Sequence, residues 1–279
     1  MDIKAVQEYL GKDWLAVRER INSALLSDIA LLNSTNESIL SHSGKQMRPM
    51  LALLIARACS AGQVSDSTIS FAAASELLHN ATLLHDDVAD GSMKRRGVPT
   101  IMSLMGPSVS VLVGDYWLVK AMDLIMDADE GNGSGVMRIF SKTLKDLAAG
   151  EMLQLQKAQN GDTDENDYLR IIYNKTASLF EAACVSAAIS VDACPEYEQA
   201  AKSYAVALGL AFQIHRLRRL AIDGLKEELL DIGLHLHRCG RVICDLTQPL
   251  GCLFGVLLQL YRLLGSAVGI TTLTLDEAS

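Results

Sequence analysis

The feature that most constrains the fold of this chain is a helical spacing of apolar residues that continues, with short interruptions, as far as residue 214. Between the interruptions there is room for helices of roughly 15 to 25 residues, and no segment alternates apolar and polar residues as a half-buried strand does. Aromatic residues make up only 5% of the chain, which also favours helix over sheet. We therefore expect an all-α bundle whose functional groups project inward from facing helices. The interruptions are Ser34-Thr35-Asn36, Ser43-Gly44, Gly97-Val98-Pro99, Gly131 to Gly135 and Gly161 to Asp164.

Length and charge exclude several classes of protein. The chain has 279 residues, 49% of them hydrophobic and 21% charged, which is ordinary globular composition. A net charge of −8 argues against a nucleic-acid surface. The six cysteines include no CxxC pair and the first residues form no apolar signal segment, so we expect free thiols and a cytoplasmic protein. The apolar stretch 246–261 is too short for a membrane span, which needs about 20 residues, and predicts a buried helix.

Three aspartates lie near the end of one helical segment, and a basic cluster follows them. On a helix Asp86 and Asp90 share a face, while Asp87 is turned by about 100°. Carboxylate oxygens are the ligands that Mg²⁺ or Mn²⁺ prefers, and a bound cation would offset the repulsion among them. The adjacent Arg95 and Arg96 offer planar guanidinium groups to a phosphate. A solvated acidic helix end followed by a basic turn is the simpler interpretation of the acidic motif alone.

Further candidates for anion binding lie upstream. Lys45 and Arg48 accompany a helix that Pro49 can open, so both cations lie at a helix N-terminus, a natural anion site. His79 lies seven residues before Asp86, two turns along the same face. Taken singly, the two cations also fit an exposed loop, and His79 fits a hydrogen-bonded core histidine.

Three polar residues of later segments complete the set of candidates. Lys175 and Thr176 offer an ammonium and a hydroxyl within a helical run. A lysine that reaches solvent along its apolar stem is the simpler interpretation of Lys175. Gln213 comes at the end of the last well-patterned helix, and by itself it indicates little.

Seven segments within residues 40–214 form an ordered series. They are GKQMRP, ELLHNATLLHDDVAD, KRRG, GDYWL, GEMLQ, YNKTASLF and FQI. In this order they resemble the trans-isoprenyl diphosphate synthases, also called polyprenyl synthetases, which implies an isoprenoid-synthase bundle of long antiparallel helices around a central apolar cavity. The resemblance also implies a homodimer.

The resemblance implies two substrate sites on this bundle. The Mg²⁺ ions that hold an allylic diphosphate would be bound by Asp86, Asp87 and Asp90, with Arg95, Lys175, Thr176 and Gln213 on the same side. Isopentenyl diphosphate would be held by Lys45, Arg48, His79 and Arg96. The residues with catalytic roles would be Asp86, Asp87, Asp90 and Lys175.

The implied reaction is ionisation of the allylic C–O bond, attack of the isopentenyl alkene on the carbocation, and loss of a proton. Diphosphate leaves only when its developing charge is neutralised, so metal ions and cationic side chains would lower the barrier. The carbocation also needs a dry, apolar cavity. Ala81 and Thr82, one turn before the acidic motif, are small, and in the family a small residue there lets the product lengthen. We therefore expect a product of twenty carbons or more.

The resemblance ends after Ile214. The family pattern calls for aspartates at 216, 217 and 220, and this chain has Arg216, Leu217 and Leu220. We therefore divide the chain into a synthase-like helical domain, 1–214, and an atypical C-terminal segment, 215–279, that is helical in part. Either a reading-frame change near codon 215 replaced the tail, or the chain is a divergent homologue with altered activity. In both cases we expect weaker substrate binding and little or no turnover.

Other classes of protein share parts of this pattern. A non-catalytic partner subunit of a heteromeric prenyl synthase would keep the fold and lose metal ligands, although the acidic motif of this chain is intact. A terpene cyclase would not need the cations at positions 45 and 48. A di-iron bundle would need two Glu-x-x-His motifs, and we find only the one from Glu76 to His79.

Overall fold

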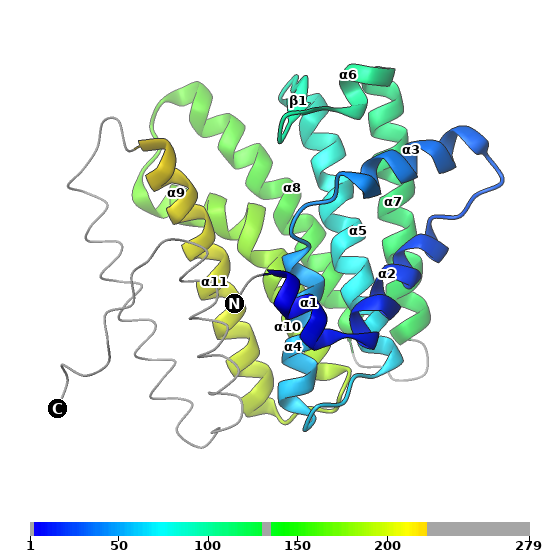
Figure 1. Ribbon diagram of the computed structural model, residues 1–279. Coiled ribbons are helices and arrows are strands. Elements are labelled where there is room, and N and C mark those ends of the chain that lie inside the picture. The colour runs from blue at the N-terminus through cyan, green and yellow to red at the C-terminus, as the bar shows by residue number, and fades with distance from the viewer. Residues whose placement is uncertain (1–2, 130–134, 222–279) are drawn as a thin grey trace.

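The computed structural model describes residues 3–129 and 135–221, which form the helical assembly in Figure 1. Most of these residues are helical, so the predicted all-α fold is confirmed. The predicted buried helix at 246–261 and everything else from 222 onward lie outside the described residues, as do the side chains of 216–221. The elements in chain order are α1 (Ile3–Leu10), α2 (Lys12–Ala24), α3 (Ala30–Ser41), α4 (Met47–Cys59), α5 (Asp66–Ala89), β1 (Lys94–Arg95), β2 (Val98–Pro99), α6 (Ile101–Met105), α7 (Pro107–Asp129), α8 (Val136–Asn160), α9 (Glu165–Ile172), the π-helix η1 (Tyr173–Ala177), α10 (Ser178–Ile189) and α11 (Pro195–Ala221).

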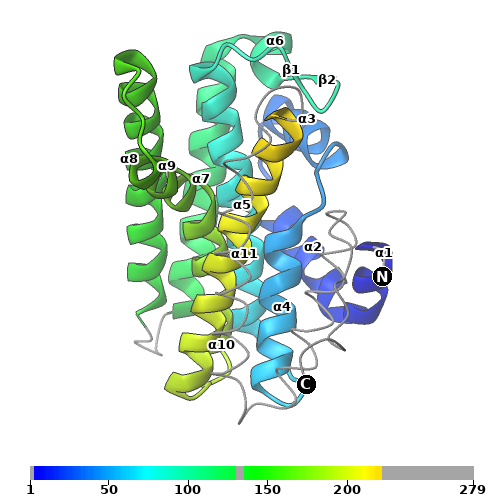
Figure 2. The ribbon, with the colours of Figure 1, turned by 90° about the vertical axis from the view of Figure 1, so that its left-hand side faces the viewer.

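Helix α5 is the central element of the bundle. It packs against α2, α4, α7 and α10, and Figures 1 and 2 show α4 and α7 running along it. The segment from Phe71 to Leu78 is buried at every position, so this part of the helix has no solvent face and must be enclosed by neighbours. Alanines at 72–74 on α5 and at 182–183 and 187–188 on α10 are completely buried. Such small side chains allow neighbouring helices to approach closely.

The start and the end of α5 are both set by local hydrogen bonds. Ser65 forms a capping box with Thr68: its hydroxyl accepts the backbone N–H of Thr68 at 3.0 Å, and the hydroxyl of Thr68 accepts the N–H of Ser65 at 3.2 Å. At the other end Asp90 is the C-cap, and its N–H donates to the carbonyl of Asp86 at 2.8 Å. The acidic motif therefore occupies the last turn of the helix.

The predicted break at Ser34-Thr35-Asn36 is wrong, because all three residues lie inside α3. Asn36 is buried, and its amide donates to the carbonyl of Leu25 at 3.0 Å and accepts the indole N–H of Trp117 at 2.8 Å. The hydroxyl of Thr35 donates to the carbonyl of Leu31 within the helix. Tertiary partners and back-bonding thus satisfy side chains that in isolation favour a turn.

The break at Gly97-Val98-Pro99 is confirmed, and it belongs to a short hairpin that the sequence did not predict. Arg95 pairs with Val98 and Lys94 with Pro99 in an antiparallel ladder. Strands of two residues are too short to show an alternating pattern. The hairpin follows α5 directly, and it brings Arg95 and Arg96 back over the end of that helix.

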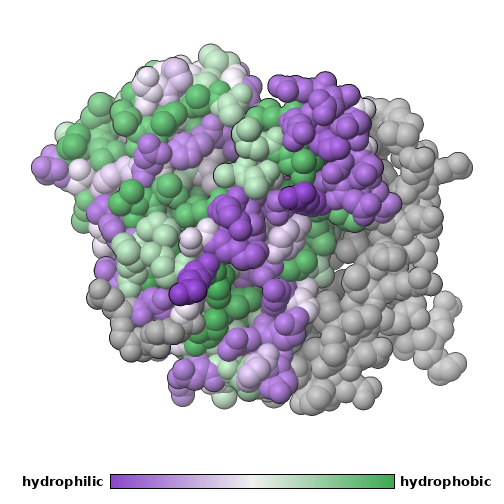
Figure 3. Space-filling model, turned by 180° about the vertical axis from the view of Figure 1, so that it is seen from behind, coloured by the Kyte–Doolittle hydropathy of each residue, from purple (hydrophilic) through white to green (hydrophobic). Residues whose placement is uncertain are grey.

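The surface is mixed in character. Figure 3 shows apolar areas interleaved with polar ones on the face opposite that of Figure 1. Four exposed apolar side chains lie on α7, namely Val111, Leu112, Val119 and Met126. In residues 3–129 and 135–221 no helix is both long and apolar enough to cross a membrane. The cysteines of this part, at positions 59, 184 and 194, are free thiols, as predicted.

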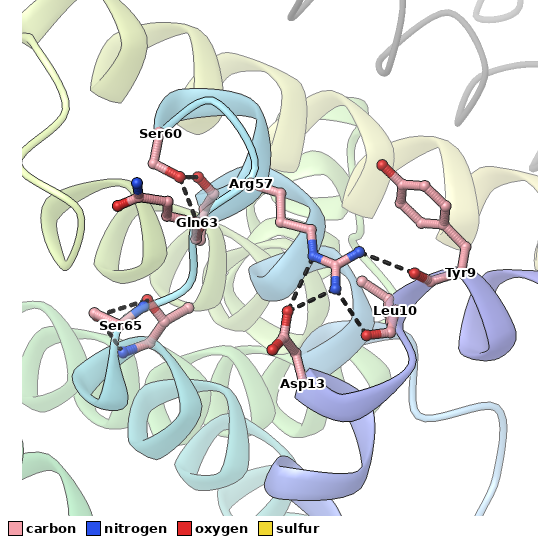
Figure 4. A network of polar contacts seen from close by, with 9 residues as sticks. Tyr9, Leu10, Asp13, Arg57, Ser60, Gln63 and Ser65 are labelled. Carbon is pink, nitrogen blue, oxygen red and sulfur yellow. Dashed lines mark hydrogen bonds and ion pairs between the residues drawn. The ribbon is translucent and has the colours of Figure 1, made fainter.

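One arginine fastens the N-terminal helices to the bundle (Figure 4). Arg57, at the end of α4, donates to Asp13 through Nε at 3.1 Å and through Nη2 at 2.6 Å. It also donates to the carbonyls of Tyr9 at 2.9 Å and Leu10 at 2.8 Å, which terminate α1. The side chains of Arg57 and Asp13 are only 17% and 14% exposed, so this ion pair is screened little by solvent.

We expect Arg57→Met to lower the free energy of unfolding by about 3 kcal/mol, because the carboxylate of Asp13 would stay enclosed without its partner. Urea unfolding of the purified protein measures this change. Asp66→Asn is the matched control: Asp66 pairs with Arg20 and is 82% exposed, so its loss should be below about 1 kcal/mol. Equal losses in the two variants would contradict the anchoring role of Arg57.

Candidate active site

The acidic motif lies in an unfavourable electrostatic position. Asp86 and Asp90 stand in the last turn of α5, where the helix dipole already places negative charge. The pKa of Asp86 is raised to about 6, chiefly by burial and also by the negative charges of Glu151 and Asp90, while Lys175 and Arg95 oppose the rise. A cation bound here would relieve this repulsion. The donor set, carboxylates alone, suits a hard divalent ion such as Mg²⁺.

Asp87 faces a different partner. It is 4% exposed, and its carboxylate accepts Nε of Arg95 at 2.9 Å and Nη2 at 2.8 Å. The hairpin therefore closes over α5 through this pair. Among the described residues no three His, Cys, Asp or Glu side chains stand close enough together to hold a metal ion. Two carboxylates at 86 and 90 suffice for Mg²⁺, which commonly takes one or two and completes its shell with water and phosphate oxygens.

A π-helix carries Lys175 and Thr176 close to the aspartates at the end of α5. In η1 the backbone is wound one residue wider than in an α-helix, a feature that often occurs at functional sites. Lys175 Nζ lies 2.5 Å from Oε2 of Glu151 and 3.2 Å from Oε1 of Gln154, both on α8. The charge of Lys175 also lowers the pKa of Asp86, so the ammonium acts on both acidic groups.

Gln213 joins the same group from α11. Its amide donates to the hydroxyl of Thr176. The residues predicted on the allylic side, at 86, 90, 95, 175, 176 and 213, are therefore neighbours in the structure. Glu151 and Gln154 were missed as functional candidates. Their spacing of three residues, which puts both on one face of α8 within the GEMLQ segment, was the available signal.

Two glycines allow the π-helix to pack closely between α8 and α11. A Cβ on Gly150 would lie 2.7 Å from Cβ of Asn174, and a Cβ on Gly209 would lie 2.5 Å from Cα of Ala177. Real side chains do not approach so closely, and in the second case the obstacle is backbone. The positions of Lys175 and Thr176 thus depend on the absence of side chains at 150 and 209.

A second cationic group lies farther back along α5. His79 is about 10 Å from Asp86 along the helix axis. Burial lowers the pKa of His79 well below its usual value, and the charges of Arg48, Arg96 and Arg95 lower it further, so it is neutral and close to these arginines. The guanidinium of Arg96 packs against Gly44, which joins the hairpin to the loop before α4.

Arg48 is held differently from the cations near Asp86. Helix α4 begins at Met47, two residues before Pro49, so Arg48 lies in its first turn and Lys45 just ahead of it. The guanidinium carbon of Arg48 lies 4.5 Å from the centre of the Phe180 ring. No hydrogen bond or ion pair engages the side chains of this second group within the described residues. By contrast, Arg95 and Lys175 are already paired with carboxylates.

Comparison with known proteins places this arrangement in a family. A sequence model of the polyprenyl synthetase family matches residues 29–215. The chain belongs to this family of prenyltransferases. The match to the family model ends at residue 215, directly before Arg216, the first position at which an expected aspartate is absent.

Individual polyprenyl synthetases are similar over most of the chain. The octaprenyl diphosphate synthase of Escherichia coli is 38% identical over 245 residues, which are 88% of this chain and 71% of that protein. The all-trans-nonaprenyl-diphosphate synthase (geranyl-diphosphate specific) of Rhodobacter capsulatus is 40% identical over 205 residues, which are 74% of this chain and 62% of that protein.

Solved structures of the family share the fold. The decaprenyl diphosphate synthase from Rhodobacter capsulatus superposes with a TM-score of 0.75 at 29% identity, over 96% of this chain and 98% of that one. A polyprenyl synthase from Caulobacter crescentus, solved as a complex with calcium and isoprenyl diphosphate, gives 0.72 at 25% identity, over 98% and 93% of the two chains. The bundle is therefore of the isoprenoid-synthase type, as the resemblance implied.

We expect Gly209→Ala to lower the free energy of unfolding by about 1 to 3 kcal/mol, because the new methyl group must push α11 away from η1. This loss should outweigh the gain of up to about 1 kcal/mol that alanine brings to a helix. Gly44→Ala is the control for stability, since its methyl group would meet only the flexible end of Arg96. If Gly209→Ala unfolded at the same urea concentration as the parent, close packing at this crossing would not matter.

We expect Asp86→Asn to stabilise the protein at pH 8 without metal by about 2 kcal/mol, after a discount for partial solvent exposure. The pKa of Asp86 in the fold lies above its usual value of 3.8, so the ionised carboxylate opposes folding above pH 6. At about pH 2.5 the carboxyl is neutral in both states, and the difference should vanish. Urea unfolding at the two pH values tests this, with Asp127→Asn on exposed α7 surface as the control.

Proposed function

We propose that this chain condenses an allylic diphosphate with isopentenyl diphosphate and makes a longer all-trans polyprenyl diphosphate. The observation that carries the proposal is that α5 serves two cationic groups, one around Asp86 and one around His79, about 10 Å apart along the helix. Two diphosphates held end to end along one wall need such an arrangement. A terpene cyclase has a single diphosphate to bind, so it has no use for the second group.

On the allylic side, the proposed Mg²⁺ ligands are Asp86, Asp87 and Asp90, and Mn²⁺ is an alternative metal. When bound, the metal ions would neutralise the negative charge that develops on the leaving diphosphate. Asp87 must exchange Arg95 for metal if it is to serve as a ligand. The released guanidinium is then available to the same diphosphate, and Lys175 provides a further positive charge there.

On the other side, isopentenyl diphosphate would lie among Lys45, Arg48, His79 and Arg96. These side chains carry no internal ion pairs in the described structure, so the anion would not have to displace a protein carboxylate. Neutral His79 can donate one hydrogen bond without adding charge. The burial around Ala81, which is 1% exposed, supports a dry path between the two diphosphates.

The proposed product has twenty carbons or more. Ala81 and Thr82 leave little bulk one turn before the acidic motif, and the similar proteins from Escherichia coli and Rhodobacter capsulatus are named for octaprenyl and nonaprenyl products. We also propose a cytoplasmic homodimer, supported by the exposed apolar side chains on α7. Sedimentation equilibrium would identify the dimer, and cell fractionation the compartment.

The proposed reaction is weakest at the second set of metal ligands, the aspartates that the family pattern has after Ile214. Arg216, Leu217 and Leu220 stand where the resemblance requires aspartates, and we keep the proposed division into 1–214 and 215–279. A non-catalytic partner subunit of a heteromeric prenyl synthase is the alternative function, favoured by this loss alone. Resequencing the region around codon 215 would reveal a frame change; an uninterrupted frame would exclude it.

Turnover distinguishes these possibilities. The purified chain is incubated with Mg²⁺, farnesyl diphosphate and labelled isopentenyl diphosphate, and extracted products are sized by chromatography. We expect binding of both diphosphates and elongation far slower than by the Escherichia coli octaprenyl diphosphate synthase run in parallel, because the aspartates that would hold further metal ions at 216, 217 and 220 are absent. Lys175→Gln, which removes one cation of the allylic site, should abolish the remaining elongation.

Each other outcome has a definite meaning. Binding without elongation would contradict catalysis by the chain alone and favour the partner subunit, which an added catalytic subunit could then test. Elongation as fast as by the reference enzyme would contradict the expected impairment. A failure to bind isopentenyl diphosphate would contradict the proposed condensation.

A further inference from the structure

A buried carboxylate in the middle of α5 is not used by any of the roles above. Glu76 is 3% exposed and lies one turn before His79. Its Oε1 accepts the amide of Asn80 at 3.2 Å, whereas its Oε2 is enclosed and has no hydrogen-bond partner. An enclosed carboxylate oxygen without a partner is costly, so a nearby positive charge is needed to compensate it.

Arg48 provides that charge from the first turn of α4. Burial lowers the pKa of Arg48 to about 10, and Glu76 is the group whose charge counteracts this. In return, Arg48 is the strongest of the influences that oppose the burial-driven rise in the pKa of Glu76, ahead of Asn80 and Arg96. The two residues are therefore electrostatic partners across the interface between α4 and α5.

Arg48 and Glu76 act on each other electrostatically, but they form no hydrogen bond with each other. Nε of Arg48 is enclosed and, like Oε2 of Glu76, has no hydrogen-bond partner. A pair that served stability alone would gain from a direct hydrogen bond, since most buried polar groups find one. Instead the guanidinium lies over the ring of Phe180, and its terminal nitrogens make no hydrogen bond within the described structure. Arg48 is thus held by its contact with the Phe180 ring and by the charge of Glu76. Its terminal N–H donors remain available to another anion.

The backbone at the start of α4 supports the same interpretation. The N-cap residue, Gln46, has φ 49° and ψ 47°, a left-handed conformation that is uncommon for a residue other than glycine. Such conformations occur where a fold fixes a functional group in place. The first turn of α4, which carries Arg48, starts directly after this residue.

We propose that Glu76 is a positioning residue for Arg48: its charge keeps the guanidinium over Phe180, with its terminal nitrogens turned toward isopentenyl diphosphate. This inference rests on the proposed function, because it assigns the anion that Arg48 receives. Glu76 does not touch the substrate. It contributes by immobilising a long side chain before the substrate arrives, which reduces the entropy lost on binding.

The Glu-x-x-His pattern of Glu76 and His79 therefore has a use that needs no metal. Both side chains are influenced by the charge of Arg48: Glu76 attracts it, and His79 is a neutral neighbour. In the part of the chain that the structure describes there is no group of three metal-ligating side chains, so nothing completes a di-iron site.

The test is a double-mutant cycle on binding. Affinities for isopentenyl diphosphate and for farnesyl diphosphate with Mg²⁺ are measured by calorimetry for the parent, Glu76→Gln, Arg48→Gln and the double variant. Glutamine keeps the shape of Glu76 and removes its charge. We expect Glu76→Gln to weaken binding of isopentenyl diphosphate about tenfold in the parent and not at all in the Arg48→Gln background.

Controls separate positioning from a general loss of structure. Affinity for farnesyl diphosphate should be unchanged in Glu76→Gln, and Ser75→Ala, at the buried neighbouring position, should leave both affinities unchanged. Glu76→Asp keeps the charge on a shorter side chain and should recover part of the affinity. If Glu76→Gln does not fold by circular dichroism, Glu76→Met, which also removes the charge at a similar side-chain length, replaces it in the cycle.

Several results would overturn the inference. One is an equal effect of Glu76→Gln in the two backgrounds; another is an equal weakening for both diphosphates. Binding needs no turnover, so a chain that binds isopentenyl diphosphate without elongating it would contradict the proposed synthesis and leave the cycle interpretable. A parent chain that does not bind this diphosphate would overturn both proposals.

Discussion

Carboxylates crowded into the last turn of a central helix are the constraint on which the rest of this structure depends. Burial, the helix dipole and the neighbouring acids all oppose the ionised form of Asp86, whose pKa is raised to about 6. Positive groups are brought to this point from two separate elements: Arg95 from the hairpin and Lys175 from the π-helix. The irregular parts of the bundle, which are costly to form, occur where they deliver these charges.

The cationic side chains near Asp86 and those near His79, at two places along α5, are held in different ways. Near Asp86, each cation is paired internally, Arg95 with Asp87 and Lys175 with Glu151. In the proposed reaction, a metal ion and a diphosphate that arrive together would exchange these pairs without leaving any charge isolated. Near His79 the cations make no such ion pairs within the described residues, and a diphosphate would add to them directly. We therefore expect binding at the first end to be an ion exchange that depends on metal, and binding at the second to be a simple addition.

The helical architecture could be predicted from the sequence because apolar spacing and turn residues are local properties. Contacts between distant segments could not. Asn36 resembles a turn residue until Trp117 and Leu25 satisfy its amide inside α3. The spacing of the aspartates correctly predicted that Asp86 and Asp90 share a face, but the direction of Asp87 is set by a hairpin too short to predict. Glu151 became a candidate only when the π-helix brought Lys175 to it.

The site residues up to Gln213 can be considered separately from positions 216, 217 and 220, where the aspartates of the family pattern are absent. The amide of Gln213 reaches Thr176, and Gly209 packs on Ala177 four residues earlier, so α11 is fixed to the π-helix before position 216. The match to the family extends through residue 215. Both cationic groups and the Asp86 wall are therefore assembled from residues that precede the divergence. Positions 216, 217 and 220 follow these contacting residues in the sequence, so we expect their departure from the family pattern to weaken catalysis more than binding.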